Sequence, residues 1–296
     1  MKIIIVGFGR MGVSHAFQIL GSIDSEPELT IVDPSILSRI VSKFLLPSRK
    51  YYKTLDEVND SNFEFGILCT PPYNRHYEVA QISKISKFCL IEKPVLCMLP
   101  KNSMSGYVMQ YCPTVNFVRE IIDKDDLEVS HIEISVQSNV DFSQGQSGWR
   151  SEEKAGGILY EFFGHALTFG LCPLSSSNKF IFSDIQVSIS ERNHFNMNFK
   201  VGETKIHCHL YGGLNVRKTR YQCNYKIFGD RNIKFDPYSV EVDKKQVNIP
   251  QIAPEIGFFL RAYEFSIQCD RLISGSRDQI DAIGINSIEN LLEELV

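Results

Sequence analysis

The sequence predicts an α/β fold in two parts. Residues 1–125 are expected to form a doubly wound parallel sheet, and residues 126–296 an α+β domain with an open, mostly antiparallel sheet. Two patterns support this division. Apolar strand-like runs alternate with helical stretches in the first part, as in parallel sheets covered by helices. From residue 129 polar and apolar residues alternate, as in strands with one face in solvent.

The strand candidates of the first part are short, apolar on both faces and rich in Ile, Leu and Val. Such strands suit a sheet that has helices on both sides. Pro113 fits the first turn of the last helix of this part. We expect strands at residues 2–6, 28–32, 64–69, 87–91 and 107–111, and helices near residues 11–20, 35–45, 74–85 and 113–123.

The second part combines further strands with three helical stretches. A Gly/Ser-rich loop is expected at residues 143–148, and Gly212-Gly213 is expected to form a hairpin turn. The pattern predicts strands at residues 129–139, 183–190, 204–211 and 221–228, and helices near residues 157–171, 255–273 and 286–295.

Composition narrows the partners and the compartment. The net charge of -4 and the lack of a Lys/Arg-rich run argue against nucleic acid as a binding partner. No apolar run approaches the roughly 20 residues that span a membrane, and the chain starts in a strand rather than a signal peptide, so we expect a cytoplasmic protein. The eight cysteines form no Cys-x-x-Cys pair and suit reduced thiols. His207-Cys208-His209 lacks a third ligand nearby, so no metal is expected.

A glycine motif of the form G-x-G-x-x-G occupies residues 7–12, between the first strand and the first helix. In this position Gly7 permits a tight turn, Gly9 lets backbone N–H groups approach a pyrophosphate, and Gly12 lets the helix pack closely on the strand. The phosphates would lie at the positive end of the helix. A plain glycine turn is the alternative. The motif predicts a Rossmann-type dinucleotide site whose contacts are Gly7, Phe8, Gly9, Arg10, Met11 and Gly12.

Asp33 ends the second strand, about 20 residues after the glycines, where a carboxylate binds the adenosine ribose hydroxyls. Its charge would repel a 2′-phosphate, and Pro34-Ser35 brings no arginine to neutralise one. We therefore expect NAD, with NADP as the alternative. Capping the helix at residues 35–45 is another role for Asp33, and both roles are compatible.

Two further motifs follow the predicted strands at residues 64–69 and 87–91. They are Thr70-Pro71, followed by His76, and Glu92-Lys93-Pro94. Open α/β sheets bind ligands at the carboxyl ends of their strands. An ammonium at Lys93 could therefore lie beside the nicotinamide and stabilise negative charge on a substrate oxygen. Taken alone, Glu92-Lys93-Pro94 would fit a solvated loop lysine better.

Together with Trp149-Arg150 and the run Gly156–His165, these motifs resemble the glucose–fructose oxidoreductase and inositol dehydrogenase family (Gfo/Idh/MocA). The resemblance covers residues 1–170 and is looser at residues 257–262 and 287–290. It implies a Rossmann domain followed by an open sheet that covers the nicotinamide. It also implies hydride transfer at a carbinol or ketone carbon, often of sugars, inositols or nucleotide sugars. We further expect a homo-oligomer formed through the C-terminal sheet.

The resemblance also implies site residues. Glu161 and His165 share a helix face at the i, i+4 spacing, and an imidazole suits proton transfer near neutral pH. A histidine packed among Phe162, Phe163 and Phe169 is the alternative. Glu161 replaces the aspartate of the family, and residues 95–106 leave little room for its usual helix, so that sheet edge is expected to be exposed or covered by a partner subunit. The expected catalytic residues are Lys93, His165 and Glu161. Besides the glycine motif and Asp33, the expected cofactor contacts are Thr70, Pro71, His76, Glu92 and Lys93. The expected substrate contacts are Lys93, Trp149, Arg150, Glu161 and His165.

The motifs therefore predict an NAD(P)-dependent oxidoreductase. A non-catalytic dinucleotide-binding sensor or scaffold would need the glycines but neither Lys93 nor His165. A redox-neutral enzyme that uses hydride transfer only transiently is a third hypothesis.

Overall fold

The chain forms two compact units. One consists of Met1–Gly106 with Phe265–Ala282, and the other of Tyr107–Glu264 with Ile283–Val296. Residues 107–125 cluster with the second unit, and the domain boundary at residue 125 stays a prediction. The computed structural model describes residues 1–24, 26–46, 50–72, 75–95, 97–140, 157–174, 180–190, 193–213, 219–229, 231–249, 267–274, 287–288, 290–292 and 294–295.

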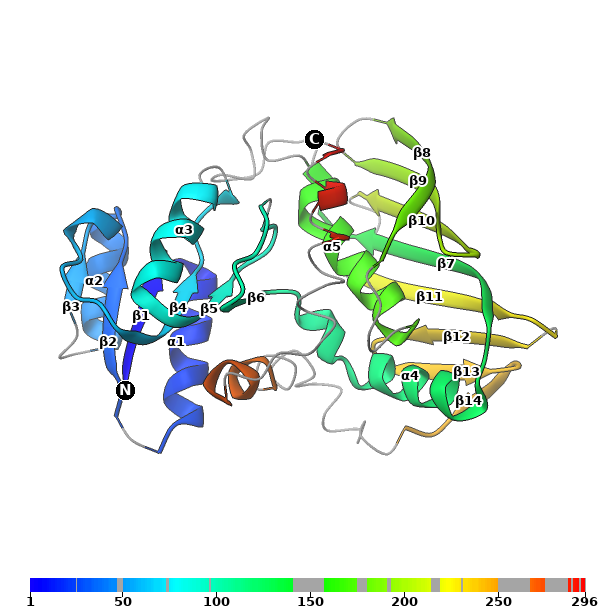
Figure 1. The fold of residues 1–296 in the computed structure, drawn as a ribbon, viewed down its shortest axis with the longest axis horizontal. Coiled ribbons are helices and arrows are strands. Elements are labelled where there is room, and N and C mark those ends of the chain that lie inside the picture. Colours follow the sequence, from blue (N-terminus) through cyan, green and yellow to red (C-terminus); the bar gives the residue numbers. More distant parts are fainter. Residues whose placement is uncertain are drawn as a thin grey trace. The chain divides into compact units, whose positions relative to one another are not determined.

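The first unit contains a six-stranded parallel sheet with the strand order β3-β2-β1-β4-β5-β6 (Figure 1). Its central strand, β1, has Ile3, Ile4 and Ile5 fully buried, because helices cover both faces. This confirms the predicted doubly wound sheet. The strands are β1 Lys2–Val6, β2 Glu28–Val32, β3 Lys50–Tyr52, β4 Phe63–Leu68, β5 Ser86–Ile91 and β6 Ser103–Ser105.

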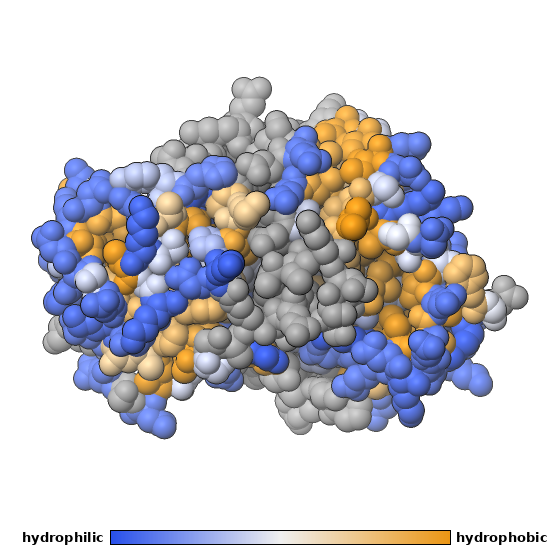
Figure 2. Space-filling model, in the orientation of Figure 1, coloured by the Kyte–Doolittle hydropathy of each residue, from blue (hydrophilic) through white to orange (hydrophobic). Residues whose placement is uncertain are grey.

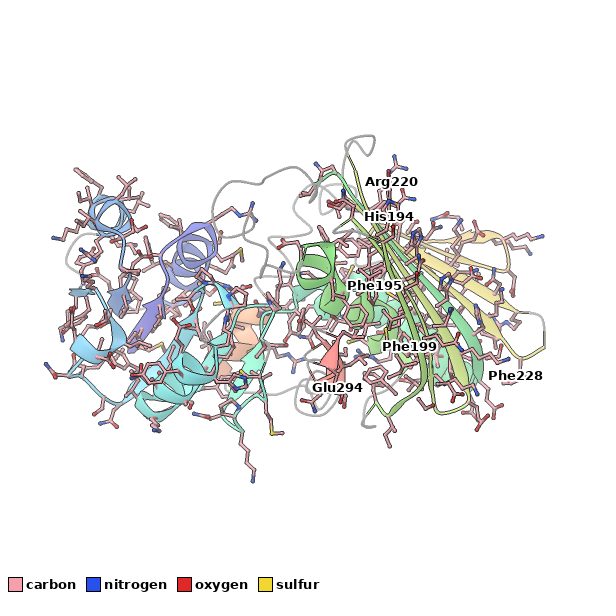
Figure 3. The ribbon with its side chains drawn as sticks, turned by 90° about the horizontal axis from the view of Figure 1, so that it is seen from above. His194, Phe195, Phe199, Arg220, Phe228 and Glu294 are labelled. Carbon is pink, nitrogen blue, oxygen red and sulfur yellow. The ribbon has the colours of Figure 1, made fainter. Side chains whose placement is uncertain are left out.

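Helices of the first unit lie where the sequence predicts them. They are α1 Arg10–Ser22, α2 Ile36–Leu45 and α3 Arg75–Ile85, with a short 3-10 turn at Leu55–Glu57. Figure 3 shows α1 and α2 on one face of the sheet and α3 on the other. Within the described ranges, no helix combines the length and apolar character needed to cross a bilayer.

The strand predicted at residues 107–111 is wrong. Val108–Tyr111 forms a 3-10 turn that leads into α4 (Pro113–Asp125), and Pro113 stands in the first turn of α4 as expected. Residues 107–111 are buried on all sides, and a short buried apolar run has no periodicity that separates strand from helix. The sixth strand is β6 instead, and the sequence prediction also missed the three-residue β3.

The sheet edge at β6 is not left for a partner subunit to cover. All three residues of β6 are buried, and Gln268 Nε2 donates to the carbonyl of Ser105 at 3.2 Å. Gln268 belongs to the helical residues 267–274, so a C-terminal segment of the same chain takes the place of the helix that residues 95–106 are too short to form.

The second unit contains an eight-stranded sheet with the order β14-β13-β12-β11-β7-β10-β9-β8, in which only β7 and β10 pair in parallel. Helix α5 (Gly157–Leu171) covers one face (Figure 1), which confirms the predicted open, mostly antiparallel sheet. The strands are β7 Val129–Ser138, β8 Phe182–Ser190, β9 His194–Val201, β10 Thr204–Gly212, β11 Arg220–Ile227, β12 Asn232–Asp236, β13 Ser239–Val242 and β14 Lys245–Val247, and a 3-10 turn at Cys172–Leu174 follows α5.

Gly212-Gly213 does not join two paired strands. β10 ends at Gly212, but the next strand, β11, pairs with β7 and β12 instead. The tight hairpin of this region joins β9 to β10, where Gly202 has φ +58°. A glycine pair indicates a turn but does not reveal which strand the chain pairs with afterwards. The predicted loop 143–148 lies outside the described residues, as do residues 255–266, 286, 289 and 293 of the two predicted C-terminal helices.

Candidate functional site

The turn after β1 requires glycine at position 7. Gly7 has φ +88°, and its N–H donates to the carbonyl of Val32 at 2.8 Å. A Cβ here would lie 2.8–2.9 Å from backbone atoms of Cys69 and Thr70. Because both the conformation and the contact exclude a side chain, Gly7 draws the end of β1 against the end of β4.

The other two glycines of the motif have opposite surroundings. A Cβ at Gly12 would overlap the carbonyl oxygen of Gly7, so Gly12 allows α1 to pack against the turn. A Cβ at Gly9 would meet no atom within 4 Å among the described residues. Gly9 is also the N-cap of α1; no side chain of the described residues caps the helix, and its first turn has no acidic residue. Among the described residues, the start of α1 thus has no side-chain cap and has open space at the Cβ position of Gly9, as a pyrophosphate site requires.

Asp33 lies beside this turn and is only 7% exposed. Its Oδ2 accepts from the Phe8 N–H at 2.6 Å, and its Oδ1 accepts from the Ser35 N–H at 2.8 Å. The N-cap of α2 is Ser35, whose hydroxyl accepts from the Ser38 N–H, so Asp33 is not the helix cap. A carboxylate has about four acceptor positions, so each oxygen keeps one for a ribose hydroxyl.

An arginine that sequence reasoning missed lies close to Asp33. Arg39 Nη1 donates to the carbonyls of Asp33 at 2.7 Å and Pro34 at 3.1 Å. The prediction considered only the two residues after Asp33, whereas Arg39 reaches back from the first turns of α2. Its contacts are with the backbone, so it fixes the turn that carries the Asp33 carboxylate.

Glu92 is held from several sides at the end of β5. It is 5% exposed, and its N–H donates to the carbonyl of Leu68 at 2.9 Å. His15 Nε2, from α1, donates to Glu92 Oε1 at 2.6 Å. A Cβ on Gly106 would lie 3.0 Å from Glu92 Oε2, so the backbone at Gly106 closes the remaining side. These contacts hold Glu92 in place, and with it the backbone that leads into the next residue, Lys93.

Arg75 joins the carboxyl ends of β4 and β5. It is 2% exposed, and its guanidinium donates to the carbonyl of Glu92 at 2.7 Å and to the carbonyl of Thr70. The Thr70 hydroxyl in turn donates to Glu78. Burial lowers the pKa of Arg75 and raises that of Glu78, while the charges of Glu78 and Glu92 favour the Arg75 cation. The two predicted motifs are thus tied together by one buried cation.

Three supporting residues were therefore missed: His15, Arg75 and Glu78. The sequence offers one weak signal, since His15 lies on the same buried face of α1 as Gly12 and Ile19. A histidine on a buried helix face needs a polar partner, but the sequence does not name it.

The remaining predicted residues of the first unit differ in exposure. Lys93 is half-buried and directly follows Glu92, and a cis peptide bond joins it to Pro94. His76 and Pro71 are exposed, and it is Arg75, the neighbour of His76, that points inward. The roles of Lys93, His76 and Pro71 stay predictions.

In the second unit, Glu161 and His165 lie one turn apart on α5, half-buried and 9% exposed respectively. The rings of Tyr107 and His165 meet edge to face, with centroids 5.4 Å apart and an interplanar angle of 86°. A Cβ on Gly164 would overlap the Tyr107 ring, so glycine at this position lets Tyr107 lie against the helix. His165 is therefore packed, with its ring orientation fixed by Tyr107.

The phenylalanines of α5 near His165 pack against aromatic rings of the sheet. Phe163 meets Phe195 of β9 with centroids 5.1 Å apart, and Phe169 meets Phe235 of β12 at 5.0 Å. Phe195 lies between its strand and α5 in Figure 3. Phe162 and Phe169 both contact Tyr221. These contacts hold α5 on the sheet. Trp149 and Arg150 lie outside the described residues.

A parallel sheet with a glycine turn, followed by an open antiparallel sheet, is the architecture of Gfo/Idh/MocA-type dehydrogenases, and comparison with solved structures finds it in such enzymes. No protein-family model matches the chain, and no curated protein matches its sequence.

Three solved structures show the likeness along nearly the whole chain. GenD2 from gentamicin A biosynthesis, in complex with NAD, is 14% identical with a TM-score of 0.70, covering 98% of this chain and 92% of its own. Apo scyllo-inositol dehydrogenase from Lactobacillus casei is 13% identical with a TM-score of 0.69, covering 99% and 95%. Levoglucosan dehydrogenase, in complex with NADH and L-sorbose, is 10% identical with a TM-score of 0.73, covering 99% and 96%. At such identities the likeness establishes the fold.

Proposed function

We propose that this chain is an NAD-dependent oxidoreductase of the Gfo/Idh/MocA type, which transfers a hydride between nicotinamide and a carbinol or ketone carbon of a sugar, inositol or nucleotide-sugar-like substrate. The observation that carries the proposal is the uncapped start of α1 at Gly9, with open space in front of it and the Asp33 carboxylate beside it. GenD2 with NAD and levoglucosan dehydrogenase with NADH and L-sorbose have the same fold and support it.

The described residues fit this cofactor. The N–H groups that follow Gly9 would hold the pyrophosphate, and the free acceptor positions of Asp33 would take the ribose hydroxyls. The buried carboxylate disfavours a 2′-phosphate, which favours NAD over NADP. Bound NAD would supply the hydride acceptor, and every other step falls to side chains of the chain.

Lys93, His165 and Glu161 are assigned to the chemistry. Oxidation of a carbinol needs a group that takes the hydroxyl proton, and we assign this to His165 because an imidazole accepts protons near neutral pH. Lys93 would bind the same substrate oxygen, supported by Glu92 and Arg75 beneath it. Glu161, one turn before His165, would orient the ring or bind a second hydroxyl.

A substrate screen tests the proposal. The purified chain would first be examined for bound nucleotide and then assayed with NAD against sugars, inositols and nucleotide sugars, following NADH absorbance. The expected result is NADH formation with at least one polyol, at a rate about 10²–10⁴-fold lower in the Lys93→Ala variant. NAD binding without turnover of any compound would favour the sensor or scaffold hypothesis, and conversion of a glycoside without net NADH would favour the redox-neutral one.

We also propose a homo-oligomer formed through the C-terminal sheet and a cytoplasmic location. The edge strand β8 supports the first, because Ile185, Val187 and Ile189 are 40%, 38% and 55% exposed. Figure 2 shows hydrophobic residues at the surface of the second unit in the region of α5 and strands β8–β10. Eight free thiols support the second, because reducing compartments preserve them.

A further inference from the structure

Helix α2 is attached to the first unit by its polar side. Ser42 is fully buried, and its carbonyl accepts from the Tyr51 hydroxyl at 3.1 Å. Arg39 donates to the carbonyl of Asp33, and the ammonium of Lys43 lies 5.6 Å from the centre of the Tyr51 ring. These contacts fix the rotation of the helix about its own axis.

The apolar side of α2 therefore faces solvent, which reverses the usual arrangement of a helix on a sheet. Figure 3 shows α2 at the margin of the first unit, with side chains projecting away from the sheet. The apolar residues form two rows at the i, i+4, i+8 spacing, so they make one continuous stripe. Their exposed fractions are 67% for Ile36, 47% for Ile40 and 84% for Phe44 in one row, and 71% for Leu37, 42% for Val41 and 42% for Leu45 in the other.

The exposed apolar area of the stripe is larger than scattered surface residues of a monomer would give. Six large apolar side chains at these exposures present on the order of 500 Å², similar to the largest patch of a typical monomer. One partner of a stable interface buries about 800 Å². A single ten-residue helix thus supplies the greater part of one side of an interface, with the rim left to its neighbours.

We propose that this face binds a second copy of the chain, with the two α2 helices antiparallel across a two-fold axis near Ile40. The row Ile36–Ile40–Phe44 is self-complementary in that arrangement, because each Phe44 meets the smaller Ile36 of the partner copy. A two-fold pair is the commonest way in which identical chains assemble. This interface is separate from the one proposed at the C-terminal sheet and does not depend on the proposed activity.

The charges on the helix favour this occupant. α2 contains no carboxylate, and its two basic residues, Arg39 and Lys43, are engaged with Asp33 and Tyr51. A membrane surface would be expected to select basic residues around the apolar stripe, and an acidic peptide would need free cations. A second apolar stripe of the same shape can cover this one without needing basic residues around it or free cations.

Sedimentation velocity on the full chain tests the proposal. The double variant Ile40→Glu/Phe44→Glu should lower the assembled mass by half relative to wild type. Tyr77→Glu is the matched control, since Tyr77 is 58% exposed on α3 of the same unit and should leave the mass unchanged. Val187→Glu on β8 separates the sheet interface from the α2 interface. Wild type that stays at 33.8 kDa at every concentration, or assembly that the double variant leaves intact, would overturn the proposal.

A cysteine variant tests the position of the axis without altering the apolar character of the stripe. Ile40→Cys should form a disulfide-linked dimer on oxidation, because the two sulfurs face each other across the axis. Ser38→Cys, on the opposite side of the helix, should not. Failure of Ile40→Cys to link copies that remain assembled, or binding of the wild-type stripe to anionic vesicles as a monomer, would contradict the pairing.

Discussion

The buried pair of His15 and Glu92 tests how the end of β5, just before Lys93, is held in place. Replacing His15 by Leu keeps the volume but leaves the Glu92 carboxylate without its α1 partner. The carboxylate cannot turn away easily, because Gly106 lies so close that a Cβ there would be 3.0 Å from Glu92 Oε2. Breaking a buried pair from one side typically costs about 3–5 kcal/mol. The Arg75 charge nearby compensates in part, so we expect about 3 kcal/mol.

The reverse and the double substitutions complete the cycle. Glu92→Leu leaves a buried imidazole without its acceptor, which should cost about 1–3 kcal/mol. In the double variant neither polar group is left unpaired, so its cost should be smaller than the sum of the two by about 2 kcal/mol.

Hydrogen exchange of the α1 and β5 amides at neutral pH, without cofactor, measures these differences within the first unit alone. Two single effects that add to within about 0.5 kcal/mol would refute the pairing as the reason for the stability of this strand end.

The remaining predictions concern specificity, chemistry and thiols. Asp33→Ser should weaken NAD binding and move the preference towards NADP in a pair of titrations; wild type that already prefers NADP would show that the reading of Asp33 is wrong. Lys93→Ala and His165→Ala should each lower turnover by about 10²–10⁴-fold with NAD affinity nearly intact, and a variant with full turnover would remove its residue from the mechanism. Burial raises the pKa of Cys89 to about 12, and burial together with the Glu92 charge raises that of Cys69 well above its usual value, so both thiols stay protonated at mildly alkaline pH. The folded chain should react with a thiol reagent far more slowly than the unfolded chain, and rapid labelling of Cys69 would contradict this.

The glycine motif and its turn could be predicted because they depend on residues that are close together in the sequence. The motif at residues 7–12 and Asp33 follow from the geometry of one strand–turn–helix unit, and the structure places them accordingly. The supports of the site were not predictable in this way. His15 and Glu92 are 77 residues apart, and only the fold brings them together.

The sequence pattern also could not predict which side of a helix faces the sheet or which strands pair. The spacing of α2 predicted a helix at the right place, but amphipathicity does not say which side faces the sheet. The polar contacts of Arg39 and Ser42 decide it. Likewise Gly212-Gly213 indicates a turn, whereas the parallel pairing of β10 with β7 depends on the register of strands distant in sequence.

A titration with NADH tests the central claim most directly. Wild type should bind NADH, and Gly9→Val should weaken binding on the order of 100-fold or more, because the branched side chain fills the space in front of α1. The substitution should lower thermal stability only slightly, since a Cβ at Gly9 meets no described atom within 4 Å and the loss is limited to a poorer N-cap. Gly21→Val is the matched control, on the same helix and equally open at its Cβ, and it should bind NADH as wild type does. Equal NADH affinity in wild type and Gly9→Val would contradict the account.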